Sequence, residues 1–242
     1  MEFNGERAII ESSEMPSFVR EDHIGRYEFA CGFVKGKRVL DVAAGSGYGS
    51  RMLLEAGALS VKGVDVSQEA VEYAKRFETN NLNFEVGDAH NLTIPPKSFD
   101  LIVSFETIEH MAEPRKFLSS LSKLLVQGGV LIISTPNRRF TSPLYWINLR
   151  PRNPHHLFEM NKKGFLNLLS NYFIIDQMYG QRLLPNILGW WPVLCSLKAI
   201  SLSFSNDDRF YYSHVLTYRN AEVHPMTAWR TGRYMIAFCR NR

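Results

Sequence analysis

Short apolar runs alternate with amphipathic segments along the chain up to about residue 140. The runs have the length of β-strands, whereas the segments between them carry apolar residues at the spacing of one helix face. Predicted strands cover 38–42, 60–66, 82–86, 99–105 and 129–134, and predicted helices cover 23–34, 50–56, 69–77 and 114–126. Because such alternation needs crossover connections, we predict a mostly parallel, doubly wound α/β sheet with helices on both faces.

The rest of the chain follows this rhythm less regularly. A polar, basic linker runs to residue 160, and it precedes a predicted helix at 162–169, a strand at 172–178 and a last strand at 234–239. The stretch 180–230 fits no repeat. We interpret it as an insertion before the final strand that forms a substrate lid or an interface, which gives a sheet of seven strands behind an N-terminal helix.

A glycine-rich turn follows the first predicted strand and predicts a nucleotide-binding cradle. Gly45, Gly47 and Gly49 allow close backbone approach, and the helix after them offers free N–H groups. Asp65 lies 20 residues after Gly45, at the end of the second strand, where a carboxylate can accept hydrogen bonds from both ribose hydroxyls. Dinucleotides and S-adenosylmethionine both suit this geometry.

The details of the turn separate these two ligands. A dinucleotide fingerprint spaces its glycines as G-x-G-x-x-G, which this turn does not. Asp41, just before the turn, would repel a pyrophosphate but suits a cationic sulfonium ligand with an ammonium group. Asp41, Asp65, Asp88 and Glu106 all fall at or just past predicted strand ends, so we expect one shared cleft at that edge of the sheet.

Five motifs in fixed order give the chain a family resemblance. They are Val39 to Gly47, Gly63 to Ser67, Gly87 to Ala89, Phe99 to Ser104, and Gly128 with Gly129. Over roughly residues 20 to 140 the chain resembles class I S-adenosylmethionine-dependent methyltransferases. That resemblance implies a Rossmann-like fold, methyltransferase activity and S-adenosylmethionine as the cofactor.

The resemblance also implies roles for individual residues. Asp65 would bind the ribose, Asp88 with the Ala89 backbone the adenine, and the turn from Ala43 to Gly47 the methionine end, with Phe105 close to it. The expected cofactor-binding residues are Arg26, Asp41, Ala43, Gly45, Ser46, Gly47, Asp65, Val66, Asp88, Ala89, Phe105 and Glu106.

Two of these positions carry conditions. Ala43 stands where the family usually has glycine, which is tolerable if its φ angle is negative. Arg26 could pair with the cofactor carboxylate, as an arginine does in similar ubiquinone-pathway O-methyltransferases; the alternative is a solvated helix face.

Methyl transfer to a hydroxyl needs a group that removes a proton, and His110 and His156 are the candidate catalytic residues. His110 follows the fourth strand, although it could instead pack structurally below the cleft. A second interpretation places Glu106, Glu109, His110 and His156 around a divalent ion, because a helical turn would put the first three on one side. This set is similar to the metal site of small-RNA 3′-terminal 2′-O-methyltransferases. The same residue types occur in similar metal-free methyltransferases, so a metal is not favoured.

The expected acceptor is a small molecule or glycan that carries a phosphate or carboxylate. Residues 138–163 hold six arginines and lysines against Glu159, and Tyr145, Trp146, Tyr211 and Tyr212 could stack on a sugar or base. The segments 3–7, 23–30 and 105–110 resemble a subgroup found in glycan and sugar-natural-product pathways, which favours O-methylation of a sugar, glycan or nucleotide-linked molecule. Methylation of RNA ribose, methylation of a phenolic or heterocyclic metabolite, and cofactor binding without catalysis stay open.

Composition narrows the setting. The net charge of +4 is too small by itself to indicate a nucleic-acid partner, and Cys31, Cys195 and Cys239 are too scattered for a disulfide framework, which favours a reducing cytoplasm. The charged start of the chain indicates no export signal, and prolines interrupt the apolar region 183–204, so we expect no transmembrane segment. That region could contact a membrane surface or bury in a dimer, which leaves monomer and homodimer open.

The length suits a single methyltransferase domain over 1–242. Its expected parts are an N-terminal cap (1–36), a cofactor-binding core (37–137), substrate or lid elements (138–230) and the final strand (231–242).

Overall fold

A computed structural model describes residues 10, 15–142, 151, 153–185, 221–227 and 230–242. Its strands are β1 (Arg38–Val42), β2 (Ser60–Asp65), β3 (Leu82–Val86), β4 (Phe99–Ser104), β5 (Leu125–Pro136), β6 (Phe173–Pro185), β7 (Val223–Pro225) and β8 (Arg230–Asn241). Its helices are α1 (Ser17–Cys31), α2 (Tyr48–Glu55), α3 (Gln68–Ala74), α4 (Pro114–Leu124), α5 (Arg138–Thr141) and α6 (Lys162–Leu169), with short 3₁₀ helices at Lys75–Phe77 and Ile108–His110.

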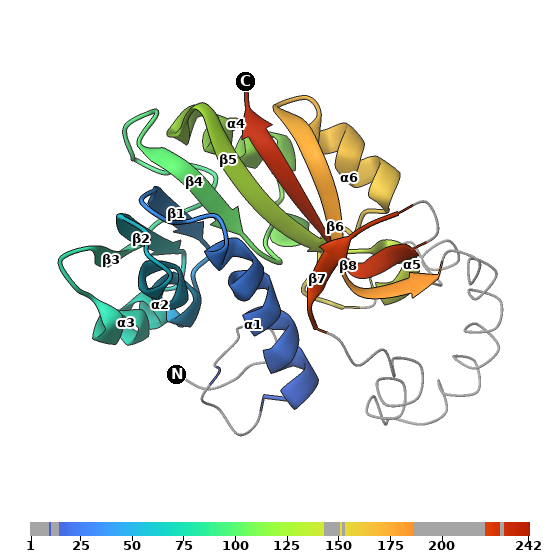
Figure 1. The fold of residues 1–242 in the computed structure, drawn as a ribbon, viewed down its shortest axis with the longest axis horizontal. Helices are drawn as coiled ribbons and strands as arrows, with labels where there is room; N and C mark the ends of the chain where they lie inside the picture. The colour runs from blue at the N-terminus through green and yellow to red at the C-terminus, as the bar shows by residue number, and fades with distance from the viewer. Residues whose placement is uncertain (1–9, 11–14, 143–150, 152, 186–220, 228–229) are drawn as a thin grey trace.

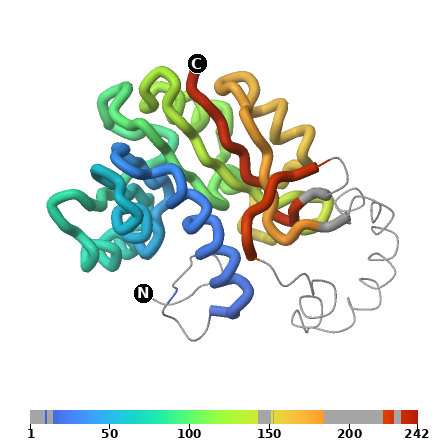
Figure 2. The backbone as a smooth tube through the Cα atoms, viewed as in Figure 1, coloured from blue at the N-terminus to red at the C-terminus, as the bar shows by residue number. Residues whose placement is uncertain are grey.

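The described strands form one eight-stranded sheet in the order β3-β2-β1-β4-β5-β8-β6-β7 (Figure 1). Strands β1 to β5 pair in parallel, whereas β8 runs antiparallel between β5 and β6. Figure 2 shows this last strand crossing the middle of the molecule to the C-terminus. The mostly parallel, doubly wound α/β sheet predicted from the sequence is therefore confirmed.

Neighbouring residues of the central strands belong to opposite cores. Leu40 and Ile102 pack into one buried cluster with α4 and α6, while Val39 and Leu101 pack into the other with α1, α2 and α3. Because successive side chains of a strand point to opposite faces, this alternation shows that helices cover both faces of the sheet. The strands consequently read as continuous apolar runs in the sequence.

The strands in the second half of the chain are longer than the sequence predicted. Strands β5, β6 and β8 are each several residues longer than expected, and the short edge strand β7 makes the sheet eight-stranded rather than seven-stranded. Polar residues such as Gln177 and Gln181 lie within β6, so hydrophobicity alone gave no sign of its full length. Most of the expected insertion, residues 186–220, lies outside the described residues.

Helix α1 extends from Ser17 to Cys31, earlier than the predicted 23–34, and its inner face meets α2 and β7. Among the residues that the structure describes, every helix is too short or too polar to span a lipid bilayer.

Candidate active site

The glycine turn is clamped against the carboxyl end of β2. The backbone N–H groups of Ala43 and Ala44 both donate to the carbonyl oxygen of Val64, at 2.8 and 3.0 Å. Gly47 has a φ of 81°, and a Cβ atom placed there would lie 2.6 Å from the Cβ of Ala74. Glycine is therefore required at this position both by the backbone angle and by the packing of α3 against the turn.

Ala43 adopts a φ of 63°, so the condition of a negative angle under which alanine would be tolerable there is not met. The chain must curl at this residue because two successive N–H groups reach the same carbonyl oxygen. A left-handed conformation costs a residue with a Cβ about 1 kcal/mol relative to glycine. The turn holds this strain at the place where the cofactor was expected to lie.

Asp65 is the residue that ties the turn to the end of β2. One carboxylate oxygen accepts the N–H of Gly45 at 2.8 Å and the other accepts the N–H of Ser67 at 2.9 Å. Each oxygen keeps a lone pair for a further donor, as two vicinal hydroxyls would require. The next residue, Val66, is 74% exposed and offers an apolar surface beside the carboxylate.

Asp41 lies beneath the turn rather than on its surface. It is the fourth of the five residues of β1, so it lies one residue before the strand end where it was expected, and it is fully buried. Its carboxylate accepts a hydrogen bond from Ser50 Oγ at 2.6 Å and from the Tyr27 hydroxyl at 3.1 Å. Burial raises the pKa of Asp41 from 3.8 to about 7. Tyr27 and Ser50 were not found from the sequence.

Arg26 is 1% exposed, so the alternative of a solvated helix face is wrong. Its Nη1 donates to Gln181 Oε1 at 2.8 Å, and its guanidinium carbon lies 4.9 Å from the ring centre of Tyr234. Within the described part of the chain, Arg26 Nε and the neighbouring Tyr48 hydroxyl are buried without a hydrogen-bond partner. Two orphaned donors of this kind suit a ligand carboxylate.

The residues expected around the adenine differ in accessibility. Asp88 is exposed, and its carboxylate accepts the backbone N–H of His90 and contacts His90 Nδ1, both at 2.9 Å, which lowers the pKa of Asp88. Ala89 packs against the core with 9% exposure, and Ser46 within the turn is fully buried. Their contacts with a cofactor stay predictions.

Glu106 follows β4 with a φ of 49°. Its carboxylate accepts a hydrogen bond from Ser134 Oγ at 2.6 Å, and its N–H donates to the same hydroxyl oxygen at 3.1 Å. Phe105 before it packs edge-on against Tyr27, with ring centres 5.0 Å apart. The 3₁₀ helix begins only at Ile108, so the predicted helical turn that would place Glu106 with Glu109 and His110 is wrong.

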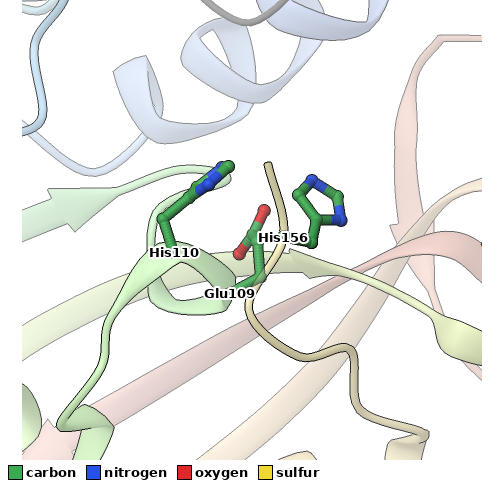
Figure 3. Close-up of side chains that lie close together, drawn as sticks. All are labelled: Glu109, His110 and His156. Atoms are coloured by element: carbon green, nitrogen blue, oxygen red, sulfur yellow. The ribbon is translucent and has the colours of Figure 1, made fainter. Parts of the chain in front are cut away.

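Glu109, His110 and His156 do come together at this edge of the sheet (Figure 3). One nitrogen or oxygen atom from each side chain lies within 4.8 Å of the others, and the two imidazole centres are 5.0 Å apart. The loop that carries His156 is held in place by the N–H of Leu157, which donates to the Glu109 carbonyl at 3.0 Å. We call these three residues the histidine cluster.

Each member of the histidine cluster has a fixed neighbour. Glu109 is fully buried and accepts the Thr135 hydroxyl at 3.1 Å, and burial, together with Glu106, raises its pKa well above 4.5. His156 Nδ1 lies 2.8 Å from Glu159 Oε1, and His110 Nδ1 lies 3.0 Å from the His155 carbonyl. Sequence reasoning did not assign a role to Glu159 or Thr135, although Glu159 follows His156 by three residues.

The basic segment is described only in part. Arg138 and Arg139 open α5 directly after β5, and Lys162 and Lys163 open α6. Arg150 and Arg152 lie outside the described residues, as do the predicted aromatic platforms Tyr145, Trp146, Tyr211 and Tyr212 and the apolar residues 187–194.

Comparison with known proteins agrees with this geometry. Residues 40–133 match the family model described as a methyltransferase domain. Over 132 residues the chain is 36% identical to the ubiquinone biosynthesis O-methyltransferase of Coxiella burnetii, covering 50% of this chain and 56% of the relative. The chain thus spans about half the length of the curated relatives that it matches.

Solved structures resemble the fold over nearly the whole chain. The YcgJ protein from Bacillus subtilis aligns with a TM-score of 0.64 and 20% identity over 91% of this chain and 99% of its own. An S-adenosylmethionine-dependent methyltransferase from Mesorhizobium loti aligns with a TM-score of 0.62 and 16% identity over 91% of this chain and 98% of its own. Residues 40–133 therefore match a methyltransferase domain, and the chain shares its fold with these solved structures.

Proposed function

We propose that the protein methylates a hydroxyl oxygen of a sugar, glycan or nucleotide-linked small molecule. The observation that carries this proposal is the position of the histidine cluster after β4, at the same sheet edge as the glycine turn and Asp65. When bound, S-adenosylmethionine supplies a methyl group whose bond to sulfur breaks as the acceptor oxygen bonds to the methyl carbon, and the sulfur keeps the electron pair.

The residues around the turn suit this cofactor along its length. Asp65 would accept the ribose hydroxyls, and exposed Val66 would cover one face of the adenine. Arg26 and Tyr48 would donate to the carboxylate of the methionine end, which would satisfy their buried and unpartnered atoms. Asp41 beneath the turn would, in its ionised form, place negative charge close to the cationic part of the ligand.

His110 is the candidate base. Its Nδ1 faces the carbonyl oxygen of His155, so the favoured tautomer carries its proton on Nδ1 and has Nε2 as the basic nitrogen. A neutral imidazole with an available ring nitrogen is a common general base for a hydroxyl proton. His156, 5.0 Å away between ring centres, is the second candidate for contact with the acceptor.

Two further observations support a hydroxyl acceptor with a negative charge. The relative from Coxiella burnetii is named an O-methyltransferase. The N-terminal turns of α5 and α6 carry Arg138, Arg139, Lys162 and Lys163, whose positive charge suits a phosphate or carboxylate on the acceptor.

The test is turnover with methyl-labelled S-adenosylmethionine and a panel of acceptors that contains nucleotide sugars, phenols and an RNA 3′ end. We expect label on an oxygen of a sugar-type acceptor together with an equal amount of demethylated cofactor. Label on nitrogen, or preference for the RNA or a phenol, would refute the proposed acceptor class. Tight cofactor binding without transfer to any acceptor would refute the proposal that the protein is an enzyme.

A further inference from the structure

The carboxylate of Glu109 is buried with one oxygen unaccounted for. Thr135 donates to Oε2 at 3.1 Å, whereas Oε1 has no hydrogen-bond partner among the described residues and the side chain is fully buried. Figure 3 shows this carboxylate lying between the rings of His110 and His156. A buried carboxylate is costly unless a cation or a set of donors compensates it. A cation that lies between these three side chains would compensate the buried carboxylate.

Both imidazoles are oriented in the way that metal-binding histidines are. Ligating histidines commonly donate their second ring N–H to a carbonyl or carboxylate, which fixes the ring and its tautomer. His110 has such a partner in the His155 carbonyl at 3.0 Å, and His156 has one in Glu159 at 2.8 Å. Glu159 is 4% exposed and is itself held by the Thr141 hydroxyl at 2.7 Å.

We propose that Glu109, His110 and His156 bind one divalent transition-metal cation through a carboxylate oxygen and the two Nε2 atoms. Ligand atoms around such a cation lie roughly 3 to 4.4 Å apart, given metal–ligand distances of about 2.0 to 2.2 Å. The present separation of up to 4.8 Å needs a closure of a few tenths of an ångström. The cation would displace the Asn153 amide, which lies 3.0 Å from His156 Nε2.

The donor set selects the class of ion. Two imidazole nitrogens and one carboxylate favour zinc, cobalt, manganese or iron over magnesium and calcium, which prefer oxygen ligands. Glu106 is not part of this group of close side-chain atoms, and one oxygen of its carboxylate accepts a hydrogen bond from Ser134 Oγ at 2.6 Å. Three protein ligands leave coordination positions open for a further oxygen.

What the cation does rests on the proposed function. A cation held by these three residues would lower the pKa of an acceptor hydroxyl bound to it, and the proton would leave to water before methyl transfer. His110 then acts as a ligand rather than as a base.

Metal binding can be tested without cofactor or acceptor. Protein treated with a chelator and desalted is titrated with Co²⁺ and separately with Mg²⁺, by calorimetry and by the visible absorption of bound Co²⁺. We expect one Co²⁺ per chain, bound at least tenfold more tightly than Mg²⁺. Absence of Co²⁺ binding, or Mg²⁺ binding of equal strength, would overturn the site.

Variants assign the binding to these residues. His156→Ala should weaken Co²⁺ binding at least about 100-fold, and Glu159→Gln, which leaves the ligands in place, about 10- to 100-fold. His155→Ala is the matched control: its exposed side chain neighbours the ligand, only its backbone carbonyl is used, and the Co²⁺ affinity should stay within about twofold. If Glu159→Gln binds Co²⁺ as tightly as wild type does, Glu159 does not orient His156. If His156→Ala binds Co²⁺ as tightly as wild type does, the proposed site is overturned.

Two controls separate this proposal from the proposed function. Binding of demethylated cofactor by each variant confirms that it is folded. Full turnover by chelator-treated protein that binds no Co²⁺ overturns the cation site alone, whereas Co²⁺ binding without turnover on any acceptor overturns the proposed function alone.

Discussion

The glycine turn and the histidine cluster lie at the same edge of the sheet but are built differently. The turn is held by backbone N–H groups and by Asp65, which is only 20 residues from its partner Gly45. The histidine cluster depends on side chains that meet across the fold, with His156 and Glu159 brought from a loop to Glu109. A local motif therefore determines the proposed cofactor end of the site, whereas tertiary packing determines its proposed acceptor end.

This difference should separate binding from chemistry. Changes at the turn should act on cofactor affinity, and changes at the histidine cluster should act on turnover. His110→Ala and Asp65→Ala test that separation, and the two variants with smaller expected effects, Asp41→Asn and Ala43→Gly, test how the turn is held.

His110→Ala removes an imidazole from the histidine cluster without touching the turn. We expect turnover to fall about 100- to 10,000-fold, because the acceptor proton loses the group that removes it or that binds the cation. Affinity for demethylated cofactor, measured by calorimetry, should stay within about twofold. Full turnover in this variant would refute the role of His110, and a parallel loss of cofactor affinity would break the separation.

Asp65→Ala removes the carboxylate that ties Gly45 and Ser67 together and is expected to hold the ribose. Loss of charge-assisted hydrogen bonds should weaken cofactor binding about 100- to 1,000-fold. The matched control is Asp100→Ala, which breaks the ion pair with Arg38 at the opposite end of β1 and β4. If both variants bind the cofactor as wild type does, Asp65 has no part in the site.

Asp41→Asn tests the buried charge beneath the turn through stability. The folded protein keeps the Asp41 proton up to about pH 7, whereas the unfolded chain releases it near pH 3.8, so the contribution of this group to stability is full below pH 3.8 and is lost progressively as pH rises from there to about 7. Between pH 5 and pH 8 the wild type should lose about 2 to 3 kcal/mol more than the variant. Denaturant unfolding at the two pH values measures this, and parallel losses would contradict the pKa of Asp41.

Ala43→Gly should give the smallest effect. Because Ala43 has a φ of 63°, glycine relieves left-handed strain, and after the entropy of the unfolded glycine is subtracted the gain should be about 0.5 kcal/mol. The converse change, Gly45→Ala, puts a Cβ at a φ of 56° in the same turn and should cost about 1 kcal/mol. A loss of stability in Ala43→Gly would show that the methyl group packs favourably.

The extent to which the sequence predicts these regions follows their construction. Strands β1, β2 and β4 read clearly because residues of both their faces are buried, and Asp65 was found because its distance from the turn is set by one βαβ unit. The sequence predicted only part of the long strands β6 and β8, since their pairing with each other tolerates polar residues.

The side chains that support the site were the least predictable. Gln181 holds Arg26 from 155 residues away, and no spacing rule connects them. Ser134 takes Glu106 out of the expected group, because the positive φ of Glu106 turns its carboxylate toward β5. Sequence reasoning named the candidate groups, but only packing showed which of them meet.

The central claim, that a cofactor held at the turn reacts at the histidine cluster, is tested most directly by a single-turnover experiment. Wild type, Asp65→Ala and His110→Ala, each at a series of methyl-labelled S-adenosylmethionine concentrations that reaches saturation, are mixed with the acceptor, and label on the acceptor oxygen is followed in time. We predict fast transfer by wild type, transfer by Asp65→Ala that recovers at high cofactor concentration, and slow transfer by His110→Ala at every concentration. Wild-type rates in saturated His110→Ala would contradict the claim.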